Sequence, residues 1–254
     1  MRTLEYQVRV LETLDAYLDA LKQEKLKANE VAELIAAKPH LGLSPLDYPK
    51  VAWDSLKAAG RLTASRAGIP FSPRRDGIGR PVPNVTLKVP TGGGKTWLAV
   101  NSVSRIVGRY LGANTGFVLW IVPNEAIYSQ TLKRLKDRQH PYRQALDRAA
   151  AGRVKIMEKE DRLHAADVET HLCVMVLMLQ AANRQTQATL KMFQDRGDVH
   201  GFFPAEGEQQ LHEAMLKAVP NLDGYQGMCP MVKDSLGNAL RLIRPIVVMD
   251  EGQK

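Results

Sequence analysis

The sequence is poor in cysteine and has no long apolar stretch. Its two cysteines, Cys173 and Cys229, cannot form a disulfide framework, and each lies among apolar residues, which suits a reducing compartment. The longest apolar run, residues 172–179, is far too short to cross a bilayer, and the N-terminus lacks the charged-then-apolar pattern of a signal peptide. We therefore expect a cytoplasmic protein with no membrane partner.

Acidic residues are scarce in one part of the chain. The net charge is +8, but residues 61–160 contain 18 Lys and Arg against 6 Asp and Glu. A nucleotide alone does not need this excess, whereas a nucleic-acid backbone crossing the surface would use it. A solvated basic surface is the alternative. The same two alternatives apply to the Pro- and Gly-rich residues 60–83, whose arginines are Arg61, Arg66, Arg74, Arg75 and Arg80.

A strand, a glycine-rich turn and a helix are predicted in succession from the segment NVTLKVPTGGGKTWLAV, residues 84–100. Apolar side chains alternate at the strand period over residues 85–89, and an apolar helical face follows the turn over residues 95–110. A glycine-rich turn in this setting is typical of a phosphate-binding loop. The alternative is an ordinary strand-to-helix turn in which the glycines serve geometry only.

The side chains and backbone of this turn have the chemistry to bind ATP. Three consecutive glycines let backbone N–H groups curl around a polyphosphate, and the following helix directs its positive end at the same anion. Lys95 is expected to reach the outer phosphates, and the Thr96 hydroxyl is expected to ligate Mg²⁺. The expected nucleotide-binding residues of the loop are Thr91, Gly92, Gly93, Gly94, Lys95 and Thr96.

The rest of the chain predicts an α/β protein with a mostly parallel sheet, because apolar strands alternate with helices. The predicted buried strands are residues 117–122, 154–157, 172–179 and 246–249. The predicted helices are residues 4–22, 29–37, 48–59, 125–138 and 206–218. In the last of these helices Leu211, Met215 and Leu216 are expected to face inward.

Two carboxylates follow the last predicted strand, where open α/β sheets place their ligands. In a phosphate-loop protein, Asp250 would hold Mg²⁺ opposite Thr96, and Glu251 would orient and deprotonate the water that attacks the γ-phosphate. An Asp-Glu pair at a strand end often has no function by itself. The phosphate loop earlier in the chain gives this pair a specific use.

These motifs resemble those of superfamily 2 helicases. VPTGGGKT resembles their motif I, VVMDEGQ resembles motif II in a DEAD/DEAH-box variant, and LWIVPNEAIYSQT is similar to motif Ia, which touches the DNA backbone in that family. LEYQ, residues 4–7, is similar to a segment whose glutamine reads adenine, so the resemblance assigns Gln7 to the base; a helix surface residue is the alternative. Within the superfamily, LKVPTGGGKT resembles the restriction subunit of type III restriction enzymes.

The resemblance implies the N-terminal RecA-like lobe of an ATP-dependent DNA helicase or translocase, with helices on both faces of its sheet. It divides the chain into a helical segment (1–60), a basic linker (61–83) and an ATP-binding lobe (84–254) with an insertion (185–244). The sequence ends before motif III, the second lobe and the arginine finger of the family, so this chain alone is expected to hydrolyse ATP slowly or not at all.

The expected cofactors are ATP and Mg²⁺, and the expected partners are a nucleic acid, DNA rather than RNA, a second RecA-like lobe and a modification subunit. A nucleotide-dependent switch or assembly ATPase that grips protein, or an inactive fragment, is the alternative function.

Overall fold

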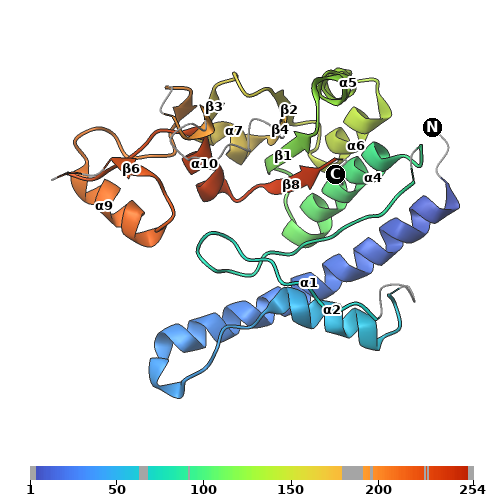
Figure 1. Cartoon of the computed structure of the whole chain (residues 1–254), viewed down its shortest axis with the longest axis horizontal. Helices are drawn as coiled ribbons and strands as arrows, with labels where there is room; N and C mark the ends of the chain where they lie inside the picture. Colours follow the sequence, from blue (N-terminus) through green and yellow to red (C-terminus); the bar gives the residue numbers. More distant parts are fainter. Residues whose placement is uncertain are drawn as a thin grey trace. The chain divides into compact units, whose positions relative to one another are not determined.

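The computed structural model describes residues 4–62, 68–90, 92–178, 191–194, 197–225, 227 and 229–250. The chain divides into two compact units (Figure 1): Met1–Gly94 with Gly108–Gly112, and Lys95–Val107 with Ala113–Lys254. Among the residues described, no helix combines the length and the apolar character that a membrane crossing requires.

Two helices form the first unit, α1 (Glu5–Ala37) and α2 (Tyr48–Ala58), with a short 3₁₀ turn, η1 (Pro39–Leu41), between them. The prediction of two separate helices over 4–37 is wrong, because α1 is continuous. Residues 22–28 contain neither Gly nor Pro and consist of good helix formers, so nothing interrupts the helix there. The first half of α1 supplies all of its buried side chains, namely Gln7, Leu11, Leu14, Tyr17, Leu18 and Leu21.

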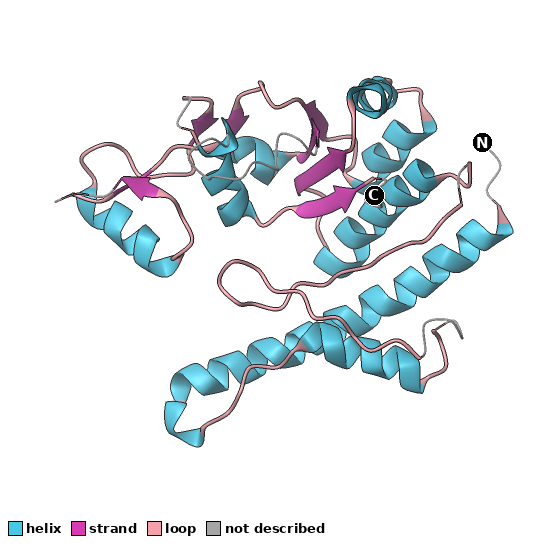
Figure 2. Cartoon of the chain, in the orientation of Figure 1, coloured by secondary structure: helices cyan, strands magenta, loops and turns pink. Residues whose placement is uncertain are grey.

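A four-stranded parallel sheet forms the centre of the second unit, with the strand order β2-β4-β1-β8 (Figure 2). Its strands are β1 (Gly116–Val122), β2 (Val154–Met157), β4 (Leu172–Met178) and β8 (Ile246–Met249). All four strands were predicted, and the α/β class with a parallel sheet is confirmed.

Helices cover both faces of this sheet. Side chains alternate between the two faces of a strand, so Trp120 of β1 packs on one face and Leu119 on the other. The first face is covered by α4 (Lys95–Arg105), α5 (Glu125–Lys136) and α6 (Pro141–Ala149). The second is covered by α7 (Ala165–Thr170) and α10 (Leu236–Ile243).

Two features of the helices and strands differ from expectation. The predicted strand over residues 85–89 does not form: these residues carry no strand assignment, and Val85 is 45% exposed. Apolar alternation produces a strand only where a neighbour completes the hydrogen-bond ladder. Strand β8 is half-exposed instead of buried, with Val247 at 53% and Met249 at 57%, because among the described strands it pairs only with β1.

The helix after the glycine loop also changes form before it ends. It is α-helical over Lys95–Arg105 and continues as a π-helix, η2, over Ile106–Leu111. The length agrees with the predicted helix over residues 95–110, but the wider turn was not foreseen.

Between β4 and β8 the described residues form short elements that apolar periodicity alone did not predict, except for α9 (Gln209–Ala218). Leu211, expected to face inward, is 53% exposed, whereas His212 is buried. The Nδ1 atom of His212 accepts from the Val232 N–H at 3.2 Å, and its Nε2 lies 3.2 Å from the Ala205 carbonyl oxygen. These hydrogen bonds place His212, and not Leu211, on the buried face of α9. Two short pairs of strands complete the described strands: β5 (Val199–His200) pairs with β3 (Leu163–His164), which precedes β4, and β6 (Gly224–Tyr225) pairs with β7 (Met231–Val232). A 3₁₀ turn, η4, covers Lys191–Phe193.

Candidate nucleotide-binding site

The three glycines of the loop are required for two different reasons. Gly92 has φ +77° and Gly94 has φ +79°, a backbone region in which other L-residues are strained. Gly93 has an ordinary φ, but a Cβ there would lie 2.7 Å from Val89 Cγ1 and 2.8 Å from Tyr6 Oη. A side chain would therefore be strained at Gly92 and Gly94 and would clash at Gly93. Thr91 lies outside the described residues.

Helix α4 begins directly after these glycines. The first N–H groups of a helix have no partner inside it, and its N-terminal end carries partial positive charge, so this end attracts anions. Lys95 and Thr96 are the first two residues of α4. The loop and the helix start together fit the chemistry of a phosphate group.

Asp250 meets Thr96 across the second unit. The Thr96 hydroxyl donates to Asp250 Oδ2 at 3.3 Å, and the Asp250 N–H donates to the Ile121 carbonyl at 3.0 Å, which extends the pairing of β8 with β1 by one residue. A hydroxyl and a carboxylate are hard oxygen ligands, and Mg²⁺ is commonly bound by one or two such groups together with substrate phosphates and water. These residues therefore fit the expected metal. Glu251 lies outside the described residues.

Gln7 lies against the glycine loop and is only 4% exposed. Its Nε2 donates to the Gly93 carbonyl at 3.0 Å, and its Oε1 accepts from the Leu4 N–H at 3.0 Å. The Tyr6 hydroxyl donates to the same Gly93 carbonyl. Gln7 is thus not a helix surface residue, while its contact with a base stays a prediction. Tyr6 was not among the predicted site residues, since a tyrosine at a helix start carries no motif of its own.

Comparison with known protein families matches residues 45–202 to "Type III restriction enzyme, res subunit". The chain belongs to this family. The res-subunit family is a family of superfamily 2 helicases, so the chain is a helicase-like ATP-dependent motor. The matched residues include the glycine loop and motif Ia, whereas Gln7 and Asp250 lie outside them. The chain matched no curated protein and no solved structure.

In this res-subunit chain, several of the basic residues are paired internally. Arg80 Nε lies 2.8 Å from Asp76 Oδ2, and Arg75 lies 3.4 Å from Asp47. Asp76 Oδ1 also accepts from the Arg80 N–H, so this part of the predicted linker is an ordered turn. Arg74 is exposed, and Arg66 lies outside the described residues. Pairing reduces the charge that this loop can offer to a phosphate backbone.

Helix α5, which follows the motif Ia strand β1, presents basic side chains to solvent. Lys136 pairs with Glu158, and this contact holds the pKa of the Glu158 carboxyl below its usual range. Arg134 lies over the ring of Tyr142. Lys133 and Arg138 are exposed. Lys133 lies in α5 and Arg138 lies two residues after its end, so both positive charges face solvent.

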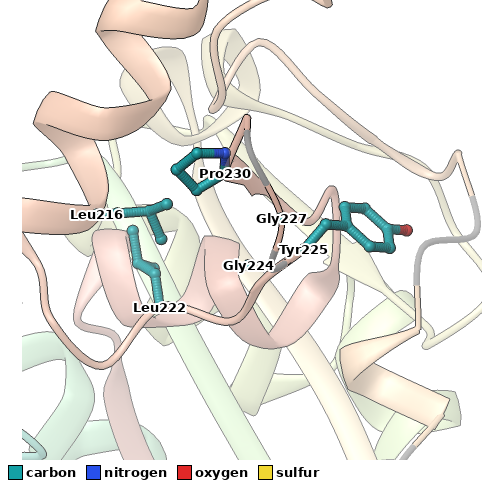
Figure 3. A pocket seen from close by; sticks show the side chains of 6 residues that line it. All are labelled: Leu216, Leu222, Gly224, Tyr225, Gly227 and Pro230. Atoms are coloured by element: carbon teal, nitrogen blue, oxygen red, sulfur yellow. The ribbon is translucent and has the colours of Figure 1, made fainter.

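A separate pocket lies between α9 and the β6–β7 hairpin. It has a volume of about 410 Å³ and is lined by Leu216, Leu222, Gly224, Tyr225, Gly227 and Pro230 (Figure 3). None of these six residues carries a charge, so the pocket does not have the chemistry of a phosphate site. Figure 1 also places α9 at the end of the second unit opposite to the carboxyl end of β8.

Proposed function

We propose that this chain is the ATP-binding lobe of a DNA helicase or translocase, the restriction subunit of a type III-like restriction-modification system. The observation that carries the proposal is the 3.3 Å approach of the Thr96 hydroxyl to the Asp250 carboxylate at the start of α4. This hydrogen bond joins residues that are 154 positions apart in sequence. Membership of the res-subunit family supports the motor function.

Each residue of the site has a defined part in this proposal. Lys95 binds the outer phosphates, and the glycine N–H groups hold the oxygens of the phosphate chain. The Thr96 hydroxyl and the Asp250 carboxylate hold Mg²⁺, which supplies positive charge to the triphosphate when bound. Glu251 accepts a proton from the attacking water, and Gln7 contacts the base.

The proposed polyanionic partner is DNA, and the motor acts in the cytoplasm together with a second RecA-like lobe and a modification subunit. The excess of Lys and Arg over residues 61–160 supports a nucleic acid, and the exposed Lys133 and Arg138 provide positions for phosphate contacts. The family description, a subunit of type III restriction enzymes, supports DNA over RNA as the proposed partner.

The nucleotide site is tested with Lys95→Ala, using Lys88→Ala as the matched control. Lys88 is exposed and lies seven positions earlier, so the control removes the same charge outside the loop. Loss of a charged hydrogen bond should weaken Mg²⁺-ATP binding by about tenfold or more in an equilibrium titration, with the control unchanged. Equal ATP affinity in both variants would overturn the proposal.

The nucleic-acid partner is tested separately through salt dependence. Replacing Lys133 and Arg138 by alanine should weaken DNA binding and reduce the slope of log affinity against log salt by about 2 if both contact phosphates. Replacing the exposed Lys38 and Lys57, which lie outside the basic stretch, is the control. DNA affinity that is absent in the unmodified chain, or equal in the two double variants, would favour a switch that grips protein.

A further inference from the structure

Two side chains at the start of α1 hold one carbonyl group of the phosphate loop. The Tyr6 hydroxyl and Gln7 Nε2 both donate to the Gly93 carbonyl oxygen, the latter at 3.0 Å. All three residues belong to the first unit. We propose that Tyr6 positions the phosphate loop: by holding the Gly93 carbonyl, it aims the Gly94 N–H at the bound phosphates. This inference rests on the proposed nucleotide-binding function.

The Gly93 carbonyl and the Gly94 N–H belong to the same peptide group, so the direction of one fixes the direction of the other. The bond between Gly93 and Gly94 is trans, and in a planar trans peptide the C=O and the next N–H point in opposite directions. A Gly93 carbonyl directed at the start of α1 therefore turns the Gly94 N–H away from α1. That N–H is the last one before α4 begins at Lys95.

Hydrogen bonds from outside the loop are needed to fix the orientation of a peptide plane between two glycines. Glycine adopts positive and negative φ almost equally well, so a peptide plane between two glycines can rotate without a steric penalty from side chains. Gly94 itself has φ +79°. Two donors on one carbonyl restrict this rotation before any ligand arrives, and a binding group that is already oriented loses less entropy when the ligand binds.

The first turn of α1 holds the two donors, the Tyr6 hydroxyl and Gln7 Nε2, in fixed positions. Gln7 is buried, and its Oε1 accepts from the Leu4 N–H at 3.0 Å, which fixes the first turn of the helix. Tyr6 Oη and Val89 Cγ1 also close the space where a Gly93 side chain would stand. Tyr6 therefore contacts the loop through both a hydrogen bond and van der Waals packing.

Positioning of the phosphate loop by Tyr6 and recognition of the base predict different effects on ligand binding. Positioning of the loop acts on the phosphates and should affect every triphosphate ligand by the same factor. Reading of adenine acts on the base and should affect ATP alone. Inorganic tripolyphosphate, which has no base, separates the two.

The test compares Tyr6→Phe with Tyr48→Phe in the whole chain. Tyr48 is a matched control, because its hydroxyl lies 3.2 Å from the Tyr110 hydroxyl and each variant loses one hydroxyl hydrogen bond within the first unit. Affinities for Mg²⁺-ATP and for Mg²⁺-tripolyphosphate are measured by titration, and Tm is measured by thermal melting.

Tyr6→Phe should weaken both ligands by a similar factor of about three to ten, the range expected for one hydrogen bond, while Tyr48→Phe binds both ligands normally. The two variants should show similar small decreases in Tm. Adding Gln7→Met to Tyr6→Phe should cause a further loss for tripolyphosphate, because the Gly93 carbonyl then has neither donor.

Three results would overturn the inference: normal tripolyphosphate binding by Tyr6→Phe, a loss confined to ATP, or equal losses in Tyr6→Phe and Tyr48→Phe. Failure of the proposed function has a different signature. In that case the unmodified chain would bind ATP no more tightly than Lys95→Ala does.

Discussion

Alanine in place of Gly93 should damage the phosphate loop through steric contact alone. Gly93 has no positive φ, so its backbone is not strained by a side chain. The added Cβ would lie 2.7 Å from Val89 Cγ1, whereas carbon atoms in contact are normally about 3.5–4.0 Å apart. It would also lie 2.8 Å from Tyr6 Oη and 3.0 Å from the Pro90 carbonyl oxygen. Relief therefore requires a shift of roughly 1 Å in the loop or its neighbours.

Overpacking of this kind costs about 1–3 kcal/mol, which corresponds to about 5- to 150-fold in an equilibrium constant. The loop can relieve the contact by moving away from Val89 and Tyr6, and that movement spoils the shape needed for phosphate. We therefore expect Gly93→Ala to lower Mg²⁺-ATP affinity by at least about fivefold in a titration. Because movement of the loop relieves the contact, the free energy of unfolding, followed through Tm, should decrease by less than the free energy of ATP binding.

Gly68→Ala is the control, since a Cβ there meets no atom within 4 Å and Gly68 has no positive φ. A second substitution gives an internal check: Val89→Ala removes the Cγ1 atom in closest contact and should restore part of the affinity lost in Gly93→Ala. If Gly93→Ala binds ATP as tightly as Gly68→Ala, the packing argument for the loop is refuted.

Three further predictions follow from other contacts. Asp250→Asn should reduce ATP affinity by about tenfold in Mg²⁺ and little in a chelator, and equal losses in both conditions would contradict a metal-binding role. His212→Leu leaves the buried Val232 N–H without its acceptor and should destabilise the α9–β7 region by about 1–3 kcal/mol, seen as faster hydrogen exchange there. Lys155 holds the pKa of Asp167 below its usual range, so their pair stabilises the fold above a pH of about 4 and loses this effect as pH falls through the lowered pKa. Asp167→Asn should lower the free energy of unfolding at pH 7 by less than about 1 kcal/mol, seen as a lower Tm. The difference in Tm between the variant and the unmodified chain should shrink at pH 3, and a constant difference would contradict the pairing.

The central part of the fold was accessible from sequence because the signals there are local and dense. β1 and β4 are almost uninterrupted apolar runs, and such runs are typical of strands buried on both faces of a parallel sheet. The residues 85–89 show the limit of this reasoning. Their alternation is as regular as that of many strands, but strand formation depends on a neighbour elsewhere in the chain, and local pattern carries no information about that neighbour.

In the candidate site too, residues of one continuous segment were predicted from sequence, whereas residues that act through long-range contacts were missed. The spacing of the glycines, Lys95 and Thr96 was visible because a phosphate loop is one continuous segment. The approach of Thr96 to Asp250 agrees with the expected order of motifs, although the roles of both residues stay predictions. Tyr6 was missed because its significance comes from one long-range hydrogen bond to Gly93. His212 was missed because apolar periodicity favours Leu211 at the neighbouring position.

The π-helical turn Ile106–Leu111 sets a limit on how the length of this chain can evolve. It contains two side chains that bind elsewhere in the first unit: Arg109 binds Asp19 at 2.6 and 2.9 Å, and the Tyr110 hydroxyl lies 3.2 Å from the Tyr48 hydroxyl. Each residue of an α-helix advances the direction of its side chains by about 100°. A one-residue deletion within the turn would therefore change the direction of these side chains relative to Asp19 and Tyr48, whereas a substitution there leaves their direction unchanged. Homologous chains should accordingly tolerate sequence change in this helix more readily than insertions or deletions.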